Sequence, residues 1–405
     1  MIIKIPDEVK YIIDTLESNG YDAYAVGGCV RDSILGSEPK DWDICTPALP
    51  EQTIKYFAEY NINIIETGLK HGTVTLILNH KPFEVTTYRI DGVYSDNRRP
   101  DKVRFVNDLK SDLSRRDFTV NSMAYNPKKG LADFFGGEKD LKAGIIRCVG
   151  DADKRFQEDA LRIMRAMRFA AVLGFEIDYA TSKAMFDNKK LLHNIASERI
   201  AVELNKMIVG NNIKEIFTRH ISVIGEIIPE ILPAGDLLQS TLAALSNAPA
   251  DVAIRLAVLF RDCGDVAANK ILSRLKYDNY TKKTVAQLIL YRGEDIQPEK
   301  KHIKRWLNKI GEERFRQLLE IKRAESEDTD NIEFILNEII TRNECFSLKD
   351  LAVNGGDLIA SGIPEGSEIG VILDKLLDMV INGQIENNKI KLLEPAEKLR
   401  KNNKI

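Results

Sequence analysis

The chain has 405 residues, and at about 150 residues per domain this length predicts about two to four packed modules instead of a single core. Its composition, with 44% hydrophobic residues, 29% charged residues, 25 glycines and 13 prolines, excludes collagen-like, low-complexity and largely disordered proteins. Because 58 Lys and Arg stand against 61 Asp and Glu, no overall positive charge attracts nucleic acid, and an anionic ligand must be bound by local groups.

Residues up to about 150 combine short β-rich runs with helical patterns and Gly-rich breaks. These runs predict strands at residues 24–26, 73–78, 83–87 and 103–106. We therefore expect an N-terminal domain with a small mixed or antiparallel sheet.

Beyond residue 150 the strand signals nearly vanish, and apolar residues recur at helical spacing over 160–173, 253–260 and 334–340. Breaks between helical modules are expected at 229–235, 291–298 and 341–347, with a Gly-rich loop over 354–370. The fold class predicted for the whole chain is α+β, with all-helical domains after the sheet.

A Gly-Gly pair follows the first expected strand. Gly27 and Gly28 open a predicted helix that carries Arg31 one turn later. Glycines at such a place allow backbone N–H groups to approach a phosphate, and the guanidinium adds a fork of donors. An ordinary turn is the alternative, and for a Gly-Gly pair taken alone it is the commoner explanation.

Two carboxylates come next, Asp41 and Asp43, separated by Trp42. On a strand both aspartates would lie on one face, about 7 Å apart, with the tryptophan on the other. Such a pair could hold two Mg²⁺ ions about 4 Å apart, which would activate a 3′-hydroxyl and neutralise a triphosphate. A solvated acidic turn is the alternative, which the nearby Gly-Gly pair and Arg31 disfavour.

Two further features lie between these aspartates and residue 101. Glu84, on the expected strand 83–87, could supply a third carboxylate to the same metals, although an exposed strand glutamate is the commoner case. Residues 91–100 are rich in mixed charge, contain Gly92 and Pro100, and have little apolar anchoring, which is typical of a mobile loop.

Arginines gather in the segment 114–121. Arg115 and Arg116 could bind triphosphate oxygens in a bidentate manner, with Asp117 and Asn121 beside them. A salt-bridge cluster at a helix start explains these residue types equally well.

The most informative predicted helix covers residues 158–171. After Asp159, arginine recurs every third residue and forms a narrow polar stripe on an otherwise apolar helix, at Arg162, Arg165 and Arg168. Asp159 as acceptor beside Arg162 as donor fits the edges of cytosine and adenine, whereas uracil and guanine would oppose an N–H to the arginine. A mismatched edge would cost about 1–3 kcal/mol. An ordinary salt-bridged helix is the alternative.

Together these residues resemble the class II tRNA nucleotidyltransferase and bacterial poly(A) polymerase superfamily, and most closely the tRNA CCA-adding enzymes. The similarity runs through five motifs in order across residues 24–204. It implies metal binding by Asp41 and Asp43 and nucleotide contacts by Gly28, Arg31, Arg116, Asp159, Arg162, Arg165 and Arg168. It also implies that residues 91–100 take part in the switch from C to A addition.

The resemblance also implies a division of the chain. The expected parts are a catalytic head over 1–150, a nucleotide-recognition neck over 151–212, a helical body over 213–345 and a tRNA-binding tail over 346–405. Many relatives carry a metal-binding His-Asp pair in the body, but here Arg261 stands in the histidine's place before Asp262. The five histidines form no compensating cluster, so we expect no phosphohydrolase activity from this degenerate HD-like region.

A basic segment lies within the expected body, with Trp306 among Lys300, Lys301, Lys304, Arg305 and Lys309. It could bind RNA phosphates, and a solvated Lys-rich helix is the alternative.

The five cysteines are far apart and form no CxxC pair, which argues against a disulfide framework and a structural zinc site. The first 13 residues contain four charged side chains, so they lack the apolar core of a signal peptide. No later segment has the roughly 18 uncharged apolar residues of a membrane span. We therefore expect a cytoplasmic protein with no membrane partner.

The sequence thus predicts a template-independent nucleotidyltransferase that adds CCA to the 3′ end of tRNA from CTP and ATP, with Mg²⁺ as cofactor. A poly(A) polymerase, or an enzyme that adds only A or only CC, stays open as an alternative. A catalytically silent RNA-binding protein is a rival from another class, and the intact Asp41 and Asp43 argue against it.

Overall fold

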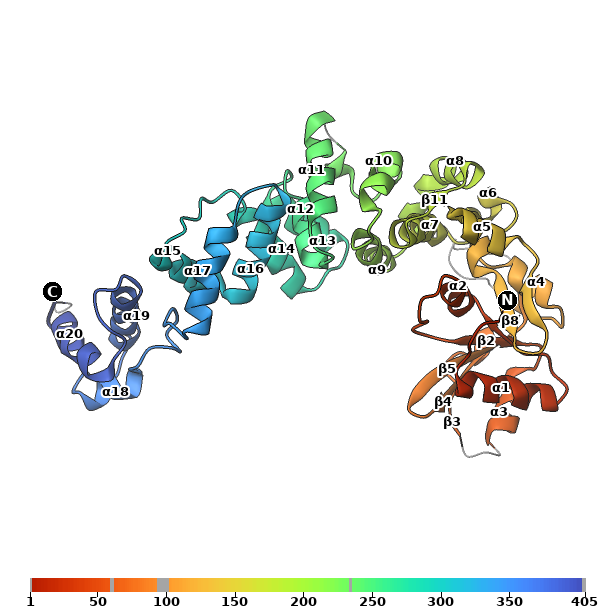
Figure 1. Ribbon diagram of the computed structural model, residues 1–405, viewed down its shortest axis with the longest axis horizontal. Coiled ribbons are helices and arrows are strands. Elements are labelled where there is room, and N and C mark those ends of the chain that lie inside the picture. Colours follow the sequence, from red (N-terminus) through yellow and green to blue (C-terminus); the bar gives the residue numbers. More distant parts are fainter. Residues whose placement is uncertain (1, 59–61, 93–101, 233–234, 403–405) are drawn as a thin grey trace. The chain divides into compact units, whose positions relative to one another are not determined.

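The computed structural model describes residues 2–58, 62–92, 102–232 and 235–402 (Figure 1). The chain forms two compact units, Met1–Gly235 with Ser273–Tyr277, and Asp236–Leu272 with Asp278–Ile405. Residues 93–100 of the expected mobile loop lie outside the described residues.

In its described residues, the first unit is built on a seven-stranded mixed sheet of order β3-β4-β5-β2-β1-β8-β9. β2 and β5 run parallel, and the other neighbouring pairs run antiparallel. Helices α1 and α3 pack on this sheet (Figure 1). The strands are β1 (Tyr24–Val26), β2 (Asp43–Thr46), β3 (Asn63–Ile65), β4 (Thr73–Leu78), β5 (Lys81–Thr87), β8 (Met123–Asn126) and β9 (Gly130–Asp133).

Two small two-stranded sheets accompany the main one. They are β6 (Arg89–Asp91) with β7 (Val103–Phe105), antiparallel, and β10 (Ile145–Ile146) with β11 (Glu176–Ile177), parallel. A core under the main sheet joins strand and helix side chains, including those of Tyr24, Cys45, Tyr88 and Leu113.

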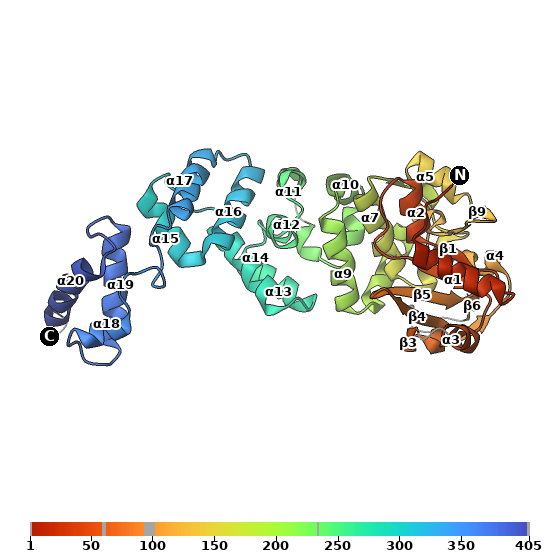
Figure 2. The ribbon, with the colours of Figure 1, turned by 60° about the horizontal axis from the view of Figure 1, so that its bottom comes forward.

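Helices α1 to α5 of the first unit alternate with the strands along the sequence, whereas α7 packs against α6, α9 and α10 (Figure 2). Their bounds are α1 (Asp7–Ser18), α2 (Gly28–Ile34), α3 (Pro50–Ala58), α4 (Leu109–Ser114), α5 (Gly137–Ala143), α6 (Ala152–Glu158), α7 (Leu161–Leu173), α8 (Tyr179–Asn188), α9 (Ser197–Ile208) and α10 (Ile213–Ile224). Short 3₁₀ turns are η1 (Leu69–His71), η2 (Thr119–Asn121), η3 (Lys189–Asn194) and η4 (Pro229–Ile231).

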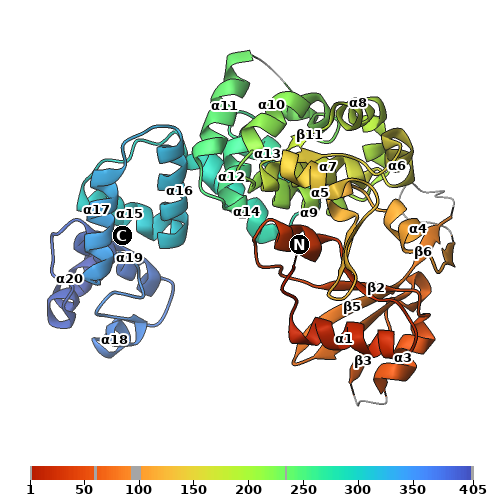
Figure 3. The ribbon, with the colours of Figure 1, turned by 45° about the vertical axis from the view of Figure 1, so that its right-hand side comes forward.

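The described part of the second unit is helical. Helices α12, α14 and α16 pack on one another, and α18, α19 and α20 form a group near the C terminus (Figure 3). This last group shares an apolar core that includes Leu358, Ile372, Leu376 and Leu392. The bounds are α11 (Gly235–Asn247), α12 (Val252–Leu259), α13 (Asp265–Arg274), α14 (Asn279–Tyr291), α15 (Lys300–Ile310), α16 (Glu312–Ala324), α17 (Asp330–Thr341), α18 (Gly355–Ala360), α19 (Glu368–Ile381) and α20 (Lys389–Asn402).

The α+β prediction is confirmed, and most expected elements are found. The strands expected at 24–26 and 73–78 are β1 and β4, and 83–87 is part of β5. The three expected helical windows fall on α7, α12 and α17.

Three details differ from expectation. The predicted strand at 103–106 is β7, which pairs with β6 outside the main sheet. The predicted Gly-rich loop 354–370 is interrupted by α18, because Asn354 and Asp357 cap that helix reciprocally, each side chain accepting from the other's backbone N–H. Asp41 does not lie on a strand, since β2 begins at Asp43.

Among the described helices, none combines the length and apolar content needed to cross a bilayer. All five cysteines fall within the described residues as free thiols, and four of them are buried.

Candidate active site

The Gly-Gly pair leads from β1 into α2. Gly27 has a φ of +84°, in the left-handed region, and a Cβ there would lie 2.9 Å from Nη1 of Arg116. Glycine therefore satisfies both the backbone conformation and the close approach of a guanidinium. Gly28 begins the helix, and one turn later Arg31 is buried and donates from Nη1 to Oδ1 of Asn121 at 2.6 Å.

Asp41 and Asp43 are both exposed, whereas Trp42 between them is buried. Glu84 of β5 lies opposite Asp43 in the parallel register of β2 and β5. Desolvation and repulsion from Glu84 raise the pKa of Asp43 to about 6, and the charge of Arg116 opposes this shift. Negative charge at this place is therefore incompletely compensated.

The donor chemistry at this edge of the sheet fits a hard divalent cation. Carboxylate oxygens are ligands that Mg²⁺ prefers, and a bound cation would relieve the repulsion that raises the pKa of Asp43. Within the described residues no preformed group of three Asp, Glu, His or Cys side chains could hold a metal. The protein thus offers the pair Asp41 and Asp43, and substrate phosphate and water would have to complete the coordination.

A fully buried carboxylate, Asp112, organises the arginines after α4. Arg115 donates to its Oδ1 from Nε at 3.0 Å and from Nη2 at 2.9 Å, so this arginine belongs to a salt bridge. Nη2 of Arg116 lies 3.8 Å from Oδ2 of Asp112, and Nε of Arg116 has no hydrogen-bond partner in the described part of the chain. Arg116 therefore has one buried donor without a partner among the described residues, and its positive charge lowers the pKa of Asp43.

A second buried carboxylate, Asp117, joins the segment before η2 to α7. Arg165 donates to its Oδ2 from Nε at 2.8 Å and from Nη2 at 2.5 Å. Asn121 donates to its Oδ1 at 3.1 Å and accepts from Arg31. Burial alone would raise the pKa of Asp117, but Arg165, with Asn121 and Arg162, lowers it to about 2. A continuous polar chain thus links α7 to α2.

The two residues of the predicted base-reading edge, Asp159 and Arg162, lie where α6 meets α7. Arg162 donates from Nη1 to Oε2 of Glu158 at 2.8 Å and from Nη2 to the carbonyl of Arg115 at 2.9 Å. Oδ2 of Asp159 lies 3.4 Å from Nη2 of Arg199. Each side chain is therefore held by a partner from a neighbouring segment, and a base would share these partners or displace them.

Sequence reasoning missed Asp112, and it gave Arg199 and Glu203 no role beyond structural support. Glu203 is buried on α9, and its Oε2 lies 3.2 Å from Nε of Arg168. Charged residues on the apolar segment 198–204 are the one sequence signal for Arg199 and Glu203, and that signal predicts only structural support. The contact with α7 is formed by packing between helices far apart in the sequence.

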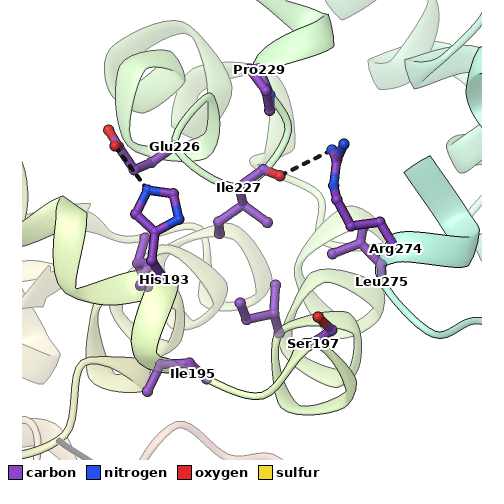
Figure 4. Close-up of a pocket in the computed structure, with 10 residues that line it drawn as sticks. His193, Ile195, Ser197, Glu226, Ile227, Pro229, Arg274 and Leu275 are labelled. Carbon is purple, nitrogen blue, oxygen red and sulfur yellow. Dashed lines mark hydrogen bonds and ion pairs between the residues drawn. The ribbon is translucent and has the colours of Figure 1, made fainter. Parts of the chain in front are cut away.

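Among the described residues, two cavities of the first unit differ in their relation to this site. One of about 530 Å³ is lined by Arg115 and Glu158 together with Ile90, Asp91, Gly92, Ser114, Lys154, Arg155 and Gln157. The other, of about 300 Å³, is flanked by His193, whose Nε2 lies 3.2 Å from Oε1 of Glu226 (Figure 4). None of its ten lining residues belongs to the predicted site.

Arg261, which stands where many relatives have a histidine, belongs to a buried hydrogen-bond network in the second unit. Its guanidinium is buried and donates from Nη1 to Oε1 of Glu325 at 2.7 Å and from Nε to Oγ1 of Thr241 at 3.0 Å. Thr241 in turn donates to Oδ2 of Asp262 at 2.7 Å. Arg261 and Asp262 are thus members of one hydrogen-bond network.

The basic residues on α15 are largely engaged within the second unit. Nζ of Lys304, a buried residue, lies 2.9 Å from Oε2 of Glu344, and Nζ of Lys300 lies 2.9 Å from Oε1 of the same side chain. Nζ of Lys309 lies 4.7 Å from the ring centroid of Trp306. Ion pairs with α17 and the residues after it hold Lys300 and Lys304, and the Lys300 side chain is still 40% exposed. The choice between a solvated face and an RNA-binding face for this segment stays a prediction.

Three family models match this chain. Residues 23–147 match a model described as the poly A polymerase head domain, and residues 252–396 match one described as a putative tRNA nucleotidyltransferase domain 2. Residues 174–220 match a probable RNA- and SrmB-binding site of polymerase A.

Relatives and solved structures match over nearly the whole chain. The CCA-adding enzyme of Lactobacillus delbrueckii subsp. bulgaricus is 36% identical over 97% of this chain and 98% of its own, and that of Ligilactobacillus salivarius is 35% identical over 98% and 99%. The Bacillus stearothermophilus CCA-adding enzyme in complex with CTP superposes with a TM-score of 0.83 at 30% identity, covering 99% of both chains. The Thermotoga maritima CCA-adding enzyme complexed with tRNA, at 21% identity and a TM-score of 0.67, shares the fold over 97% of this chain and 96% of its own.

Proposed function

This chain belongs to the CCA-adding enzymes, and from that premise we propose that it adds C, C and A in turn to the 3′ end of tRNA from CTP and ATP. The reaction is a nucleotidyl transfer, in which the terminal 3′-oxygen of the tRNA forms a bond to the α-phosphorus and pyrophosphate leaves. The protein's own part is to position the two substrates and to stabilise developing charge.

One observation carries the assignment of this activity to a place in the molecule. Arg116 connects the carboxylate pair with the Gly-Gly turn. Its charge lowers the pKa of Asp43, and its Nη1 lies 2.9 Å from the place that a Cβ on Gly27 would occupy. A nucleotidyl transfer needs a cation site and a triphosphate site side by side, and this arrangement supplies both.

Nucleotidyltransferases of this family generally use a divalent metal, and we assign Mg²⁺ to Asp41 and Asp43. When bound, Mg²⁺ supplies Lewis-acid activation of the 3′-hydroxyl and neutralises charge on the triphosphate. The two aspartates must be ionised for this purpose. Because the pKa of Asp43 is about 6, this carboxyl group is mostly ionised above pH 6. Glu84 is adjacent to Asp43 and keeps the negative charge of the site high.

The nucleotide contacts divide between two groups of residues. Gly28, Arg31 and Arg116 hold the triphosphate, with Arg165 and Arg168 contributing from α7. Asp159 and Arg162 read the Watson–Crick edge of the incoming base, because an acceptor beside a donor fits cytosine and adenine and opposes uracil and guanine. Arg115 and Glu158, which both accept hydrogen bonds from Arg162, line the cavity of about 530 Å³, whose described lining residues include neither Asp159 nor Arg162.

We further propose the division into a head over 1–150, a neck over 151–212, a body over 213–345 and a tRNA-binding tail over 346–405. A poly(A) polymerase and a silent RNA-binding protein are disfavoured by relatives that match over nearly the full length and are named CCA-adding enzymes.

The decisive experiment incubates tRNA transcripts that end in the discriminator base, in C, or in CC with each labelled nucleoside triphosphate, and sequences the tails. We expect tails that end in CCA and stop there. Long A-only tails on unrelated RNA would instead identify a poly(A) polymerase. Tails that stop at CC, or A added only to transcripts already ending in CC, would narrow the activity to one half of the sequence.

A further inference from the structure

Phe169 of α7 lies among three guanidinium groups. The Cζ atoms of Arg168, Arg31 and Arg165 lie 3.9, 5.1 and 5.3 Å from the centroid of its ring. Phe118 contacts the same ring in a T-shaped arrangement, with 5.8 Å between centroids and 78° between planes. One aromatic side chain is thus the shared neighbour of an arginine from α2 and two from α7.

Each of these arginines also has a carboxylate partner. Arg31 pairs with Asp32 at 2.7 Å and Arg165 with Asp117 at 2.5 Å, while Arg168 lies 3.2 Å from Glu203. The three carboxylates come from α2, from the segment before η2 and from α9. Each guanidinium thus has its own carboxylate, and the ring of Phe169 is a neighbour that all three guanidiniums share.

Gathering three like charges is unfavourable unless something between them offsets the repulsion. Burial, and repulsion from Arg165 and Arg31, lower the pKa of Arg168 to about 10, against the opposing charge of Glu203. An aromatic face attracts a guanidinium through its quadrupole. The ring attracts the guanidinium without forming hydrogen bonds to its in-plane N–H groups, whereas a carboxylate in the place of the ring would accept hydrogen bonds from those groups.

We propose that Phe169 is a positioning residue for the triphosphate: its ring holds Arg31, Arg165 and Arg168 in one cluster whose N–H groups bind phosphate oxygens of the incoming nucleotide. The inference rests on the proposed function, since it takes the triphosphate site as given and adds the residue that assembles it. Phe169 itself touches the arginines and not the reacting atoms.

The test compares Phe169→Leu, which keeps an apolar side chain and removes the aromatic face, with Phe169→Tyr, which keeps the face. Phe186→Leu is the matched control, because Phe186 packs against the His220 ring on α10 in the same unit. Steady-state kinetics give KM and kcat for CTP, ATP and tRNA. Calorimetric titration with inorganic tripolyphosphate in the presence of Mg²⁺ gives the affinity for the phosphate chain alone, and thermal unfolding checks the fold.

We expect Phe169→Leu to raise KM for CTP and ATP, and to weaken tripolyphosphate binding, by the same factor of about 3–30-fold. KM for tRNA, the preference for CTP over UTP and the behaviour of Phe186→Leu should stay as in the wild type, and Phe169→Tyr should recover most of the loss. Unchanged tripolyphosphate affinity in folded Phe169→Leu would overturn the proposal, as would equal defects in the Leu and Tyr variants. Failure of the wild type to add CCA would count against the proposed function instead, because tripolyphosphate binding is measured without catalysis.

Discussion

Asp43 and Glu84 lie directly opposite each other on β2 and β5, the parallel pair of the main sheet, and the charge of Glu84 helps to raise the pKa of Asp43 to about 6. This juxtaposition places excess negative charge at the point where the sheet meets the arginine cluster. It makes metal binding, activity and stability depend on pH in directions that can be stated in advance.

Metal affinity should fall by about tenfold for each pH unit below 6 and stay nearly constant above it, since only the ionised Asp43 binds a cation. Glu84→Gln removes the repulsion and should move this acid limb to lower pH. Calorimetric titration with Mg²⁺ between pH 5 and pH 8 measures both curves. If the acid limb of the Glu84→Gln variant lies at the same pH as that of the wild type, then the charge of Glu84 does not raise the pKa of Asp43.

Stability without metal should change in the opposite sense. Because the pKa of Asp43 is raised on folding, the folded protein binds the proton more tightly, and this favourable contribution is lost as the pH rises from 3.8 through about 6. Asp43→Asn should therefore be more stable than the wild type at pH 8, by at most about 1 kcal/mol after allowance for solvent screening of an exposed group. Urea unfolding at pH 5 and pH 8 tests this, and a destabilised Asn variant at pH 8 would contradict it.

Asp41→Ala and Asp43→Ala should each reduce incorporation of both CMP and AMP by at least about 100-fold, because each removes a metal ligand from the site. The circular dichroism spectra should match that of the wild type, since both side chains are exposed. Single-turnover incorporation on tRNA ending in C measures the loss. Wild-type turnover by either variant in Mg²⁺ would mean that the metal is held elsewhere.

Gly27→Ala should raise KM for both nucleotides, because the added Cβ would meet Nη1 of Arg116 at 2.9 Å and displace that guanidinium. Gly36→Ala is the matched control: its φ of +76° imposes the same kind of backbone strain, but nothing lies within 4 Å of the new Cβ. Both variants should lose about 1 kcal/mol of stability from the left-handed conformation. If the two variants have equal KM values for CTP and ATP, Arg116 does not contact the nucleotide.

Replacing Asp159 or Arg162 should change the preference among the four bases more than it changes the rate of nucleotidyl transfer. Replacing either residue by Ala should reduce discrimination against UTP and GTP by about tenfold or more, which corresponds to the loss of one matched edge. Relative kcat/KM values for the four nucleoside triphosphates are the measurement. Glu158→Gln is a useful control, since it weakens the ion pair that Arg162 makes while leaving the proposed edge intact. If kcat/KM falls equally for all four nucleoside triphosphates, both residues have a structural role and do not select the base.

The sequence by itself determined the class of the fold and the chemical character of the site. Runs of β-forming residues located β1 and β4, and helical spacing of apolar residues located α7, because these local patterns follow the geometry of the backbone. The Gly-Gly pair, the two aspartates and the arginines at every third position were visible because each motif is contiguous in the chain.

Tertiary structure decided which charges meet. Asp112 accepts two hydrogen bonds from Arg115 and lies farther from Arg116, at 3.8 Å. Glu203 of α9 reaches Arg168 across the packing interface between α7 and α9. The shared ring of Phe169 likewise depends on Arg31 of α2 reaching α7, although the two helices are more than a hundred residues apart in sequence. No local pattern encodes such pairings, since a side chain's partner across an interface depends on the placement of both elements and not on spacing within either.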